Sequence, residues 1–547
     1  MLSIPPGTLC WLGCWILLAS QSLAADPPTV ERLFPLGGQL GSISDVSVTG
    51  KLGEGEIRVL GEAEAMTWTL NEKRDAFTVQ IAESARPGLH WIRLANAAGV
   101  SEPVPFVVGV IPEVVEQEPN ATLAQAQRVE LPASTVNGAL KESRDVDTFA
   151  VELAAGATLV ASLQAQQVFG SPMDAVLQVV SSRGIVVAQN HDDGSLDPRV
   201  IFTAPSAGMW YVRLFAYPAD PNSTIAFASG ASYLYRLTIS TGSVVDHVIP
   251  LCRSSNDAAT ELQLFGWNLS GPQLSMTREQ PEWLAVGTLP VRVPLVSEPA
   301  ISAEQLGAAP LGRPMLVSGQ VAPGETVSFT LAGEANEKVS LQVEAQRWRS
   351  LLDPVLAVYA PDGKLLKEVD DTVRNQPDAA LDLTLPAAGE YRVTIRDRFS
   401  HGGGRYYYLL RCQPTQPSWS ASLDKTAYSL PGGQMLEIPL TITRSQGFAE
   451  VIEFQAEGLP EGVTAEAVRS EKEGDSSKKV TLKLSAAPTA SYQGPIRLLG
   501  TSSGENSSQF AHKRLVDDTL ESAIWLTVIG TAAEEPAAAE QPAGNAE

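Results

Sequence analysis

Histidine and cysteine are scarce in this chain, which has five and four of them among 547 residues. These are too few side chains for a protein dense in metal or haem cofactors. Basic residues are also in short supply, since 39 Lys and Arg stand against 62 Asp and Glu, for a formal net charge of −23. This balance argues against nucleic acid as a partner and against docking on anionic lipid, because both need a basic surface.

Long stretches of helical periodicity are missing beyond the N-terminal segment, whereas valine, threonine, glycine and proline are plentiful. Apolar residues make up 44% of the chain, enough for sizeable cores. Short alternating runs separated by turn residues are typical of β-sandwiches. We therefore predict an all-β protein of tandem β-sandwich domains, jelly-roll-like and immunoglobulin-like.

The first 25 residues have the features of a secretory signal peptide. An apolar stretch, Leu9 to Leu18, precedes a small-x-small cleavage site at Ser22-Leu23-Ala24. We expect the mature chain to begin near Ala25 or Asp26 and to be secreted or held at the cell exterior or in the periplasm, with no further membrane-spanning segment. An uncleaved anchor and lipidation at Cys14 are alternatives.

The mature chain keeps two cysteines, Cys252 and Cys412. Two cysteines cannot form a zinc site alone. In an oxidising compartment they could pair, and the favoured alternative is two separate buried thiols.

An internal repeat spans much of the chain. Val136-Asn137-Gly138 recurs as Val317-Ser318-Gly319, and Pro205-Ser206-Ala207-Gly208 as Pro386-Ala387-Ala388-Gly389, both roughly 180 positions later. Several motifs at one near-constant offset predict a duplicated domain.

A smaller repeat precedes each copy. Phe34-Pro35-Leu36 resembles Ile249-Pro250-Leu251, and each motif is followed by a strand containing a glycine, Gly50 or Gly266. These glycines suit a tight turn or a bulge.

The predicted organisation has seven parts. They are a signal peptide (1–25), a small β domain (26–110), a β-sandwich (111–242), a truncated β module (243–300), a degenerate second sandwich (301–413), an immunoglobulin-like sandwich (414–529) and a disordered acidic tail (530–547).

Four motifs of the first large copy carry a family resemblance: Glu116-Gln117-Glu118-Pro119-Asn120, Val136-Asn137-Gly138, Asp145-Val146-Asp147-Thr148-Phe149 and Gly208-Met209-Trp210-Tyr211-Val212. Together they resemble the bacterial pre-peptidase C-terminal domain, which implies a jelly-roll-like sandwich on a secreted protein, often beside a peptidase. Residues 301–413 resemble a degenerate second copy. The opening module is similar to IPT/TIG domains, and the whole arrangement to exported proteins of planctomycete-type bacteria.

Acidic side chains of the first copy form a candidate metal site. Glu116, Glu118 and Asn120 alternate and so share one face of an extended segment, as do Asp145 and Asp147. Carboxylate and amide oxygens are the ligands that calcium prefers, and the resemblance implies calcium, because some members of that family bind it. We expect one Ca²⁺ in this copy and none in the second; a polar linker beside a solvated turn is the alternative.

Catalytic motifs are weak. Gly500-Thr501-Ser502-Ser503-Gly504 matches G-x-S-x-G, but no amphipathic helix follows it. His191 beside Asp192 and Asp193 suggests acid/base or metal chemistry, and a polar hairpin tip explains it more simply. The tyrosines that end each copy, among them Tyr235 and Tyr408, suit sheet packing or a ligand-stacking platform.

We therefore predict a secreted, non-catalytic protein of the bacterial cell surface that binds extracellular protein or polysaccharide or has a structural role. An accessory subunit or relic of an exported peptidase is the alternative. A hydrolase with an unrecognised site is a third, and it would need a cleft with convergent catalytic side chains.

Overall fold

The computed structural model describes residues 26–61, 65–220, 226–371, 378–503, 508–516 and 519–531. The predicted signal peptide and nearly all of the predicted tail lie outside the described residues. Strands dominate, and the helices described are two single turns, α1 (Gln166–Phe169) and α2 (Ala303–Leu306), with two 3-10 turns, η1 (Gln346–Trp348) and η2 (Asp475–Ser477). The all-β prediction is confirmed. None of the helices in the described ranges has the length and apolar character needed to cross a bilayer.

We call residues 26–110, 111–242, 243–300, 301–413 and 414–529 the first to fifth modules. The first module has two sheets, ordered β1-β3-β6-β5 and β2-β9-β7-β4, with β8 on β7. Its strands are β1 (Thr29–Phe34), β2 (Gly37–Gln39), β3 (Ile43–Lys51), β4 (Arg58–Gly61), β5 (Met66–Leu70), β6 (Ala76–Ile81), β7 (Gly88–Asn96), β8 (Gly99–Val100) and β9 (Val104–Gly109).

The second module is a sandwich of two five-stranded sheets, ordered β10-β12-β19-β14-β17 and β11-β13-β18-β15-β16. Its strands are β10 (Glu113–Val115), β11 (Gln127–Arg128), β12 (Ala133–Ala139), β13 (Asp147–Leu153), β14 (Thr158–Gln164), β15 (Met173–Ser181), β16 (Val186–Asn190), β17 (Arg199–Thr203), β18 (Gly208–Pro218) and β19 (Leu234–Ser240). Alternate apolar residues of both sheets fill one core between them.

The fourth module repeats this strand order without a counterpart of β11, as β27-β28-β35-β30-β33 and β29-β34-β31-β32. Its strands are β27 (Ala300–Ser302), β28 (Met315–Gln320), β29 (Thr326–Gly333), β30 (Lys338–Glu344), β31 (Pro354–Tyr359), β32 (Leu365–Val369), β33 (Ala379–Thr384), β34 (Gly389–Asp397) and β35 (Tyr407–Pro414). The two large modules therefore share one topology.

The third module is smaller, with one three-stranded sheet, β20-β22-β23, and two strand pairs, β21-β26 and β24-β25. Its strands are β20 (Val244–Ile249), β21 (Arg253–Ser254), β22 (Ala259–Trp267), β23 (Gln273–Thr277), β24 (Trp283–Leu284), β25 (Val291–Arg292) and β26 (Leu295–Val296).

The fifth module is a sandwich ordered β36-β38-β42-β40 and β37-β47-β43-β39-β41, with β44 on β43 and a separate β45-β46 pair. Its strands are β36 (Ser418–Ser422), β37 (Ala427–Pro431), β38 (Met435–Ser445), β39 (Ile452–Glu457), β40 (Val463–Glu466), β41 (Val468–Ser470), β42 (Lys479–Ala486), β43 (Tyr492–Thr501), β44 (Ser508–Phe510), β45 (Lys513–Arg514), β46 (Leu520–Glu521) and β47 (Ile524–Ile529).

Gly50 and Gly266 occupy the same kind of bulge in the first and third modules. Gly50 pairs with Val30 and Gly266 with Val245, and the strand register shifts directly after each partner. Both glycines have positive φ angles, 145° and 157°. A side chain would place Cβ 2.0 Å from a carbonyl oxygen of the partner strand at either position, so the predicted bulge requires glycine.

Each small module is joined to the large module after it by the same type of hydrogen bond. The backbone N–H of Leu36 donates to Asn137 Oδ1 at 3.0 Å. The backbone N–H of Leu251 donates to Ser318 Oγ at 2.9 Å. The paired motifs noted in the sequence thus form two equivalent joints.

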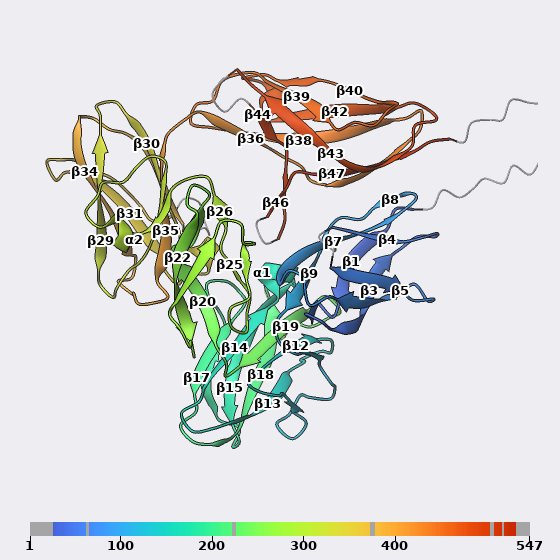
Figure 1. The fold of residues 1–547 in the computed structure, drawn as a ribbon, viewed down its shortest axis with the longest axis vertical. Helices are drawn as coiled ribbons and strands as arrows, with labels where there is room; N and C mark the ends of the chain where they lie inside the picture. Colours follow the sequence, from blue (N-terminus) through green and yellow to red (C-terminus); the bar gives the residue numbers. More distant parts are fainter. Residues whose placement is uncertain are drawn as a thin grey trace, which may run out of the picture.

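The fifth module lies beside the first, at the opposite end of the sequence (Figure 1). Glu102 accepts hydrogen bonds from the backbone and hydroxyl of Thr426, at 2.9 and 3.0 Å, and from Lys513 at 2.9 Å. Arg93 donates to the same hydroxyl at 2.8 Å. Polar contacts therefore join the fifth module to the first.

The two cysteines are unpaired and buried in different clusters, which confirms the prediction of separate thiols. Burial raises the pKa of Cys252 and of Cys412 to about 12. Both thiols are therefore protonated at neutral pH.

Candidate metal centre

The segment that follows β10 runs along the second module and positions the acidic side chains. The backbone N–H of Glu116 donates to the carbonyl of Asn137 in β12, at 3.0 Å, and Thr148 in β13 donates to the carbonyl of Asn120 at 3.1 Å. The segment therefore spans from one sheet to the other. The sequence-based prediction needed this arrangement, because it brings the acidic residues of the segment close to those at the start of β13.

Three carboxylates meet there. Glu116, Glu118 and Asp147 each present an oxygen, and these three atoms lie within 4.8 Å of one another. Glu116 and Asp147 are buried, with 8% and 0% of their surface exposed, whereas Glu118 faces solvent. Two buried acidic groups and one at the surface form a site that opens on one side.

Tyr235 of β19 lies against this cluster. Its hydroxyl is 3.0 Å from Glu116 Oε2 and in hydrogen-bonding contact with Asp147 Oδ2. A Cβ at Gly138 would lie 2.3 Å from that hydroxyl and 2.4 Å from Glu116 Oε2, so glycine is needed at this position. Tyr235 was predicted to pack in the sheet or to stack against a ligand, and its contact with the carboxylates was not predicted. The contact depends on the strand register that sets Tyr235 opposite Gly138.

The other two predicted ligands differ from each other. Asn120 is fully buried, and neither its Oδ1 nor its Nδ2 has a hydrogen-bond partner. Asp145 lies outside the three-carboxylate group, and its Oδ2 accepts hydrogen bonds from the backbone N–H groups of Lys141 and Glu142, at 2.7 and 3.1 Å. Asp145 thus orders the turn that precedes β13.

Electrostatics make the cluster costly without a bound cation or proton. Burial and the nearby charge of Glu116 raise the pKa of Asp147 to about 9. Burial likewise raises the pKa of Glu116, although hydrogen bonds from Ala139 and Tyr235 oppose this shift. A bound cation would replace the proton that holds these carboxylates together at neutral pH.

Unpartnered atoms in the same place test whether a hard cation fits. Asp147 Oδ1 and Asn120 Oδ1 are buried without a hydrogen-bond partner. Such groups are rare in folded proteins unless something else satisfies them. An all-oxygen set of carboxylate and amide groups is the chemistry that calcium favours, so the residues fit that ion.

The fourth module keeps the tyrosine of this site but not the carboxylates. Tyr408 lies against Gly319 as Tyr235 lies against Gly138, and its hydroxyl is buried without a partner. Ala303 takes the place of Glu116 beside that glycine, and Val327 stands where the second module has Asp147. The fourth module therefore supplies a natural control for the second.

The proposed catalytic motifs have structural roles where they are described. Asp193 is buried and accepts two hydrogen bonds from Arg405, whereas His191 and Asp192 form an exposed pair. The interpretation as a polar hairpin tip is therefore wrong for Asp193, and it fits His191 and Asp192. In the G-x-S-x-G string, Gly500 and Thr501 end β43, which pairs with β44, and Gly504 lies outside the described residues.

Some residues of this site lie at the edge of a region that matches a known domain family. Residues 145–216 match the bacterial pre-peptidase C-terminal domain. The match contains Asp145 and Asp147 and most of the strands of the second module. No curated protein matches the chain.

Solved structures resemble the chain only weakly. Fibronectin(III)-like modules of Clostridium thermocellum CbhA share 14% identity, over 37% of this chain and 94% of that one, with a TM-score of 0.13. Escherichia coli alpha-2-macroglobulin shares 10%, over 93% and 47%, with a TM-score of 0.14. Tripeptidyl peptidase 2 shares 9%, over 92% and 40%, with a TM-score of 0.15. The chain thus spans less than half the length of the last two proteins.

Proposed function

We propose that this protein is an exported, non-catalytic bacterial scaffold that binds extracellular protein or polysaccharide through the loops and sheet faces of its β-sandwiches. The matched domain and the tandem sandwiches support this proposal. The shared strand order supports the assignment of residues 301–413 as a degenerate second copy of that domain. A chain of this kind displays surfaces at fixed distances from one another.

The observation that carries the proposal is the network of buried ion pairs between modules. Arg405 of the fourth module binds Asp193 of the second, and Arg199 of the second binds Asp246 of the third. All four side chains are largely buried, with exposed fractions of 21%, 1%, 7% and 4%. Buried charge pairs favour one geometry because a displaced charge would be left unpaired. The network therefore supports a rigid frame rather than modules on flexible linkers.

Calcium is the second part of the proposal. The ion would be held by Glu116, Glu118 and Asp147, with Asn120 beside them and Asp145 ordering the adjacent turn or contributing an oxygen. It would supply positive charge to the cluster and fix the segment after β10 to the sandwich. The hydrogen bond between Leu36 and Asn137 joins the first module to the second beside this segment. The ion would therefore also stiffen the joint between these two modules.

An accessory role beside an exported peptidase is the second candidate. The family of the matched domain favours it, because its name refers to peptidase precursors. In this reading the partner is a peptidase rather than a surface polymer.

Capture from the exported fraction tests both candidates. The mature chain, residues 26–547, is immobilised in calcium, and retained protein and polysaccharide are identified by mass spectrometry and sugar analysis. Saturable retention of an envelope protein or a polysaccharide supports the scaffold, and retention of a peptidase supports the accessory role. Purified chain that itself hydrolyses peptide or glycoside substrates would contradict both.

A further inference from the structure

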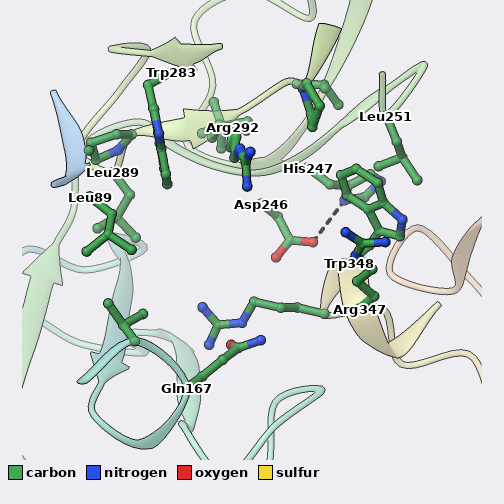
Figure 2. A pocket seen from close by; sticks show the side chains of 18 of the residues that line it. Leu89, Gln167, Asp246, His247, Leu251, Trp283, Leu289, Arg292, Arg347 and Trp348 are labelled. Carbon is green, nitrogen blue, oxygen red and sulfur yellow. Dashed lines mark hydrogen bonds and ion pairs between the residues drawn. The ribbon is translucent and has the colours of Figure 1, made fainter. Parts of the chain in front are cut away.

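A cavity of about 430 Å³ lies where the modules meet. Its walls come from all five modules, for example Leu89 of the first, Gln167 of the second, Asp246 of the third, Trp348 of the fourth and Val516 of the fifth. Figure 2 shows side chains of this junction around a common space. Its volume falls within the range of small-molecule binding sites.

The lining is basic although the chain as a whole is acidic. Two acidic side chains, Asp246 and Glu344, line the cavity. Six arginines face the same space: Arg199, Arg236, Arg292, Arg347, Arg349 and Arg411. In a protein of net charge −23, guanidinium groups gathered at one cavity form a candidate anion site where one of them lacks an acidic partner.

Most of these arginines already have acidic partners. Arg199 pairs with Asp246, and Arg236 with Glu113. Arg411 lies 3.0 Å from Glu298 and 3.4 Å from Glu344. The half-exposed Arg292 and Arg347 likewise pair with Glu282 and Glu344, respectively.

Arg349 differs from the other five in forming no ion pair within the described part of the chain, although the charges of Asp197 and Asp193 act on it. Its Nε and Nη2 are shielded from solvent and have no hydrogen-bond partner. Leaving guanidinium donors buried and unpaired is costly, and the fork that they form suits a carboxylate or another planar or tetrahedral oxyanion. Arg349 lines the cavity and therefore holds unpaired donors beside it, which a bound oxyanion would satisfy once the side chain turns toward it.

The backbone at Arg349 adds a second observation. It ends η1 with φ of 64° and ψ of 24°, and Gly170 ends the equivalent turn α1 of the second module with φ of 64° and ψ of 23°. Glycine adopts this left-handed conformation without strain, whereas the Cβ atom of arginine is crowded against the backbone in it. Arg349 thus occupies a position where the backbone conformation favours glycine.

Apolar and aromatic side chains form the rest of the wall. In Figure 2, Trp283, Leu89 and Leu289 lie toward one side of the cavity and Trp348 and Leu251 toward the other. Such walls suit the body of a ligand rather than its charge.

We propose that this junction is a binding site for a small organic anion, an aromatic or apolar body bearing one carboxylate or sulfonate group, whose oxygens are bound by Arg349. The site goes beyond the scaffold role, because the ligand would contact every module and favour their docked arrangement. A carboxylate and a sulfonate present the same oxyanion chemistry to a guanidinium group, and the experiment separates them.

Two fluorescent probes test the proposal on the mature chain. The anion 8-anilinonaphthalene-1-sulfonate should bind one per chain and raise the melting temperature. In Arg349→Gly, its affinity should fall about tenfold or more, whereas that of neutral N-phenyl-1-naphthylamine should change less than about twofold. This variant suits the backbone conformation, so it should fold, and the neutral probe reports any effect of losing the apolar stem of the side chain. Arg144→Gly, an exposed arginine with the same φ of 64°, is the matched control and should bind both probes normally.

Competition then defines the ligand. 1-Naphthoate and naphthalene-1-sulfonate should displace the anionic probe from the wild type, and the stronger competitor identifies the preferred group. Inorganic sulfate at the same concentration should not. Equal displacement by sulfate, equal loss of both probes in Arg349→Gly, or many weak sites per chain would overturn the proposal.

Discussion

Arg405 holds Asp193 with two parallel hydrogen bonds, of 2.6 and 2.8 Å, although 212 positions separate the two residues in the sequence. The pair joins a loop of the fourth module to a loop of the second. Arg199 lies 3.6 Å from the same carboxylate and also binds Asp246 of the third module. Three modules thus share one charge network.

Replacing Arg405 by alanine should destabilise this junction by about 3–5 kcal/mol, because it leaves Asp193 buried with a weakened partner. The measurement is the urea midpoint of the mature chain, followed by tryptophan fluorescence. Arg398→Ala is the control, since Arg398 pairs with Asp370 at the surface, where both side chains are over 40% exposed. Its loss should cost less than about 1 kcal/mol. Equal effects of the two variants would show that the buried network contributes nothing special.

Calcium should stabilise the second module through Asp147. At a calcium concentration 100-fold above Kd, binding would contribute about 2.7 kcal/mol, seen as a higher melting temperature than in chelator. Asp147→Asn should abolish this shift. In the absence of calcium it should not destabilise the protein, because it replaces a buried acid that repels Glu116.

The control for calcium lies in the fourth module. Asp362→Asn changes an exposed turn carboxylate of that module and should leave the calcium response intact. A calcium-dependent rise in melting temperature that survives Asp147→Asn would place the ion elsewhere. If calcium does not change the melting temperature of the wild type, the carboxylates bind protons and no calcium.

Much of the fold follows from sequence patterns, since strand alternation and repeated motifs are local signals. Gly50 and Gly266 indicated their bulges because a positive φ restricts the residue type. The acidic cluster was predicted in part: alternation placed Glu116 and Glu118 on one face, but only the fold shows that Asp145 turns toward Lys141.

Contacts between modules were not predictable in this way. Asp193 and Arg349 occur in polar stretches typical of loops, and nothing in their neighbours indicates burial against a distant module. The one signal for Arg349 was its alignment with Gly170 at the predicted repeat offset, where a left-handed residue closes the turn. Burial at a module junction depends on how whole sheets dock, which short-range patterns do not encode.

Acid should loosen the junction before it unfolds the modules. Burial lowers the pKa of His247, although its hydrogen bond to Asp246 opposes this shift. The ring is stacked between Phe265 and Tyr407, and Arg199 and Arg405 face the same carboxylate. Because the folded pKa is below the unfolded value of about 6.5, the unfolded state takes up the proton first, and stability falls as pH drops through that range.

The expected slope is at most about 1.4 kcal/mol per pH unit from this residue, between about pH 6.5 and its lowered pKa. Protonation of Asp246 affects stability only at lower pH. Burial alone would raise its pKa, but the hydrogen bond from His247 and the charges of Arg199 and Arg405 hold it below the usual range. Its contribution is therefore lost only below about pH 4. Asp147, with its pKa raised to about 9, gives a slope of opposite sign over the same range, so each variant is compared with the wild type. Between pH 5 and 7, His247→Gln should lower the slope of the urea midpoint against pH relative to the wild type, and His191→Gln, whose side chain is exposed, should not. Identical slopes in both variants would exclude His247 as the source.

The two joints between small and large modules give the last prediction. Asn137→Ala removes the acceptor of the Leu36 N–H and the donor to Glu113, and Ser318→Ala removes the acceptor of the Leu251 N–H. A buried N–H left without a partner costs about 1–3 kcal/mol, so the amide concerned should exchange with solvent about 5- to 100-fold faster. Hydrogen exchange read by mass spectrometry on peptides around Leu36 and Leu251 makes each variant the control for the other. Asn137→Ala should speed exchange only at Leu36 and Ser318→Ala only at Leu251. Faster exchange at both sites in either variant would mean that the four modules open together, and that these bonds do not act as separate joints.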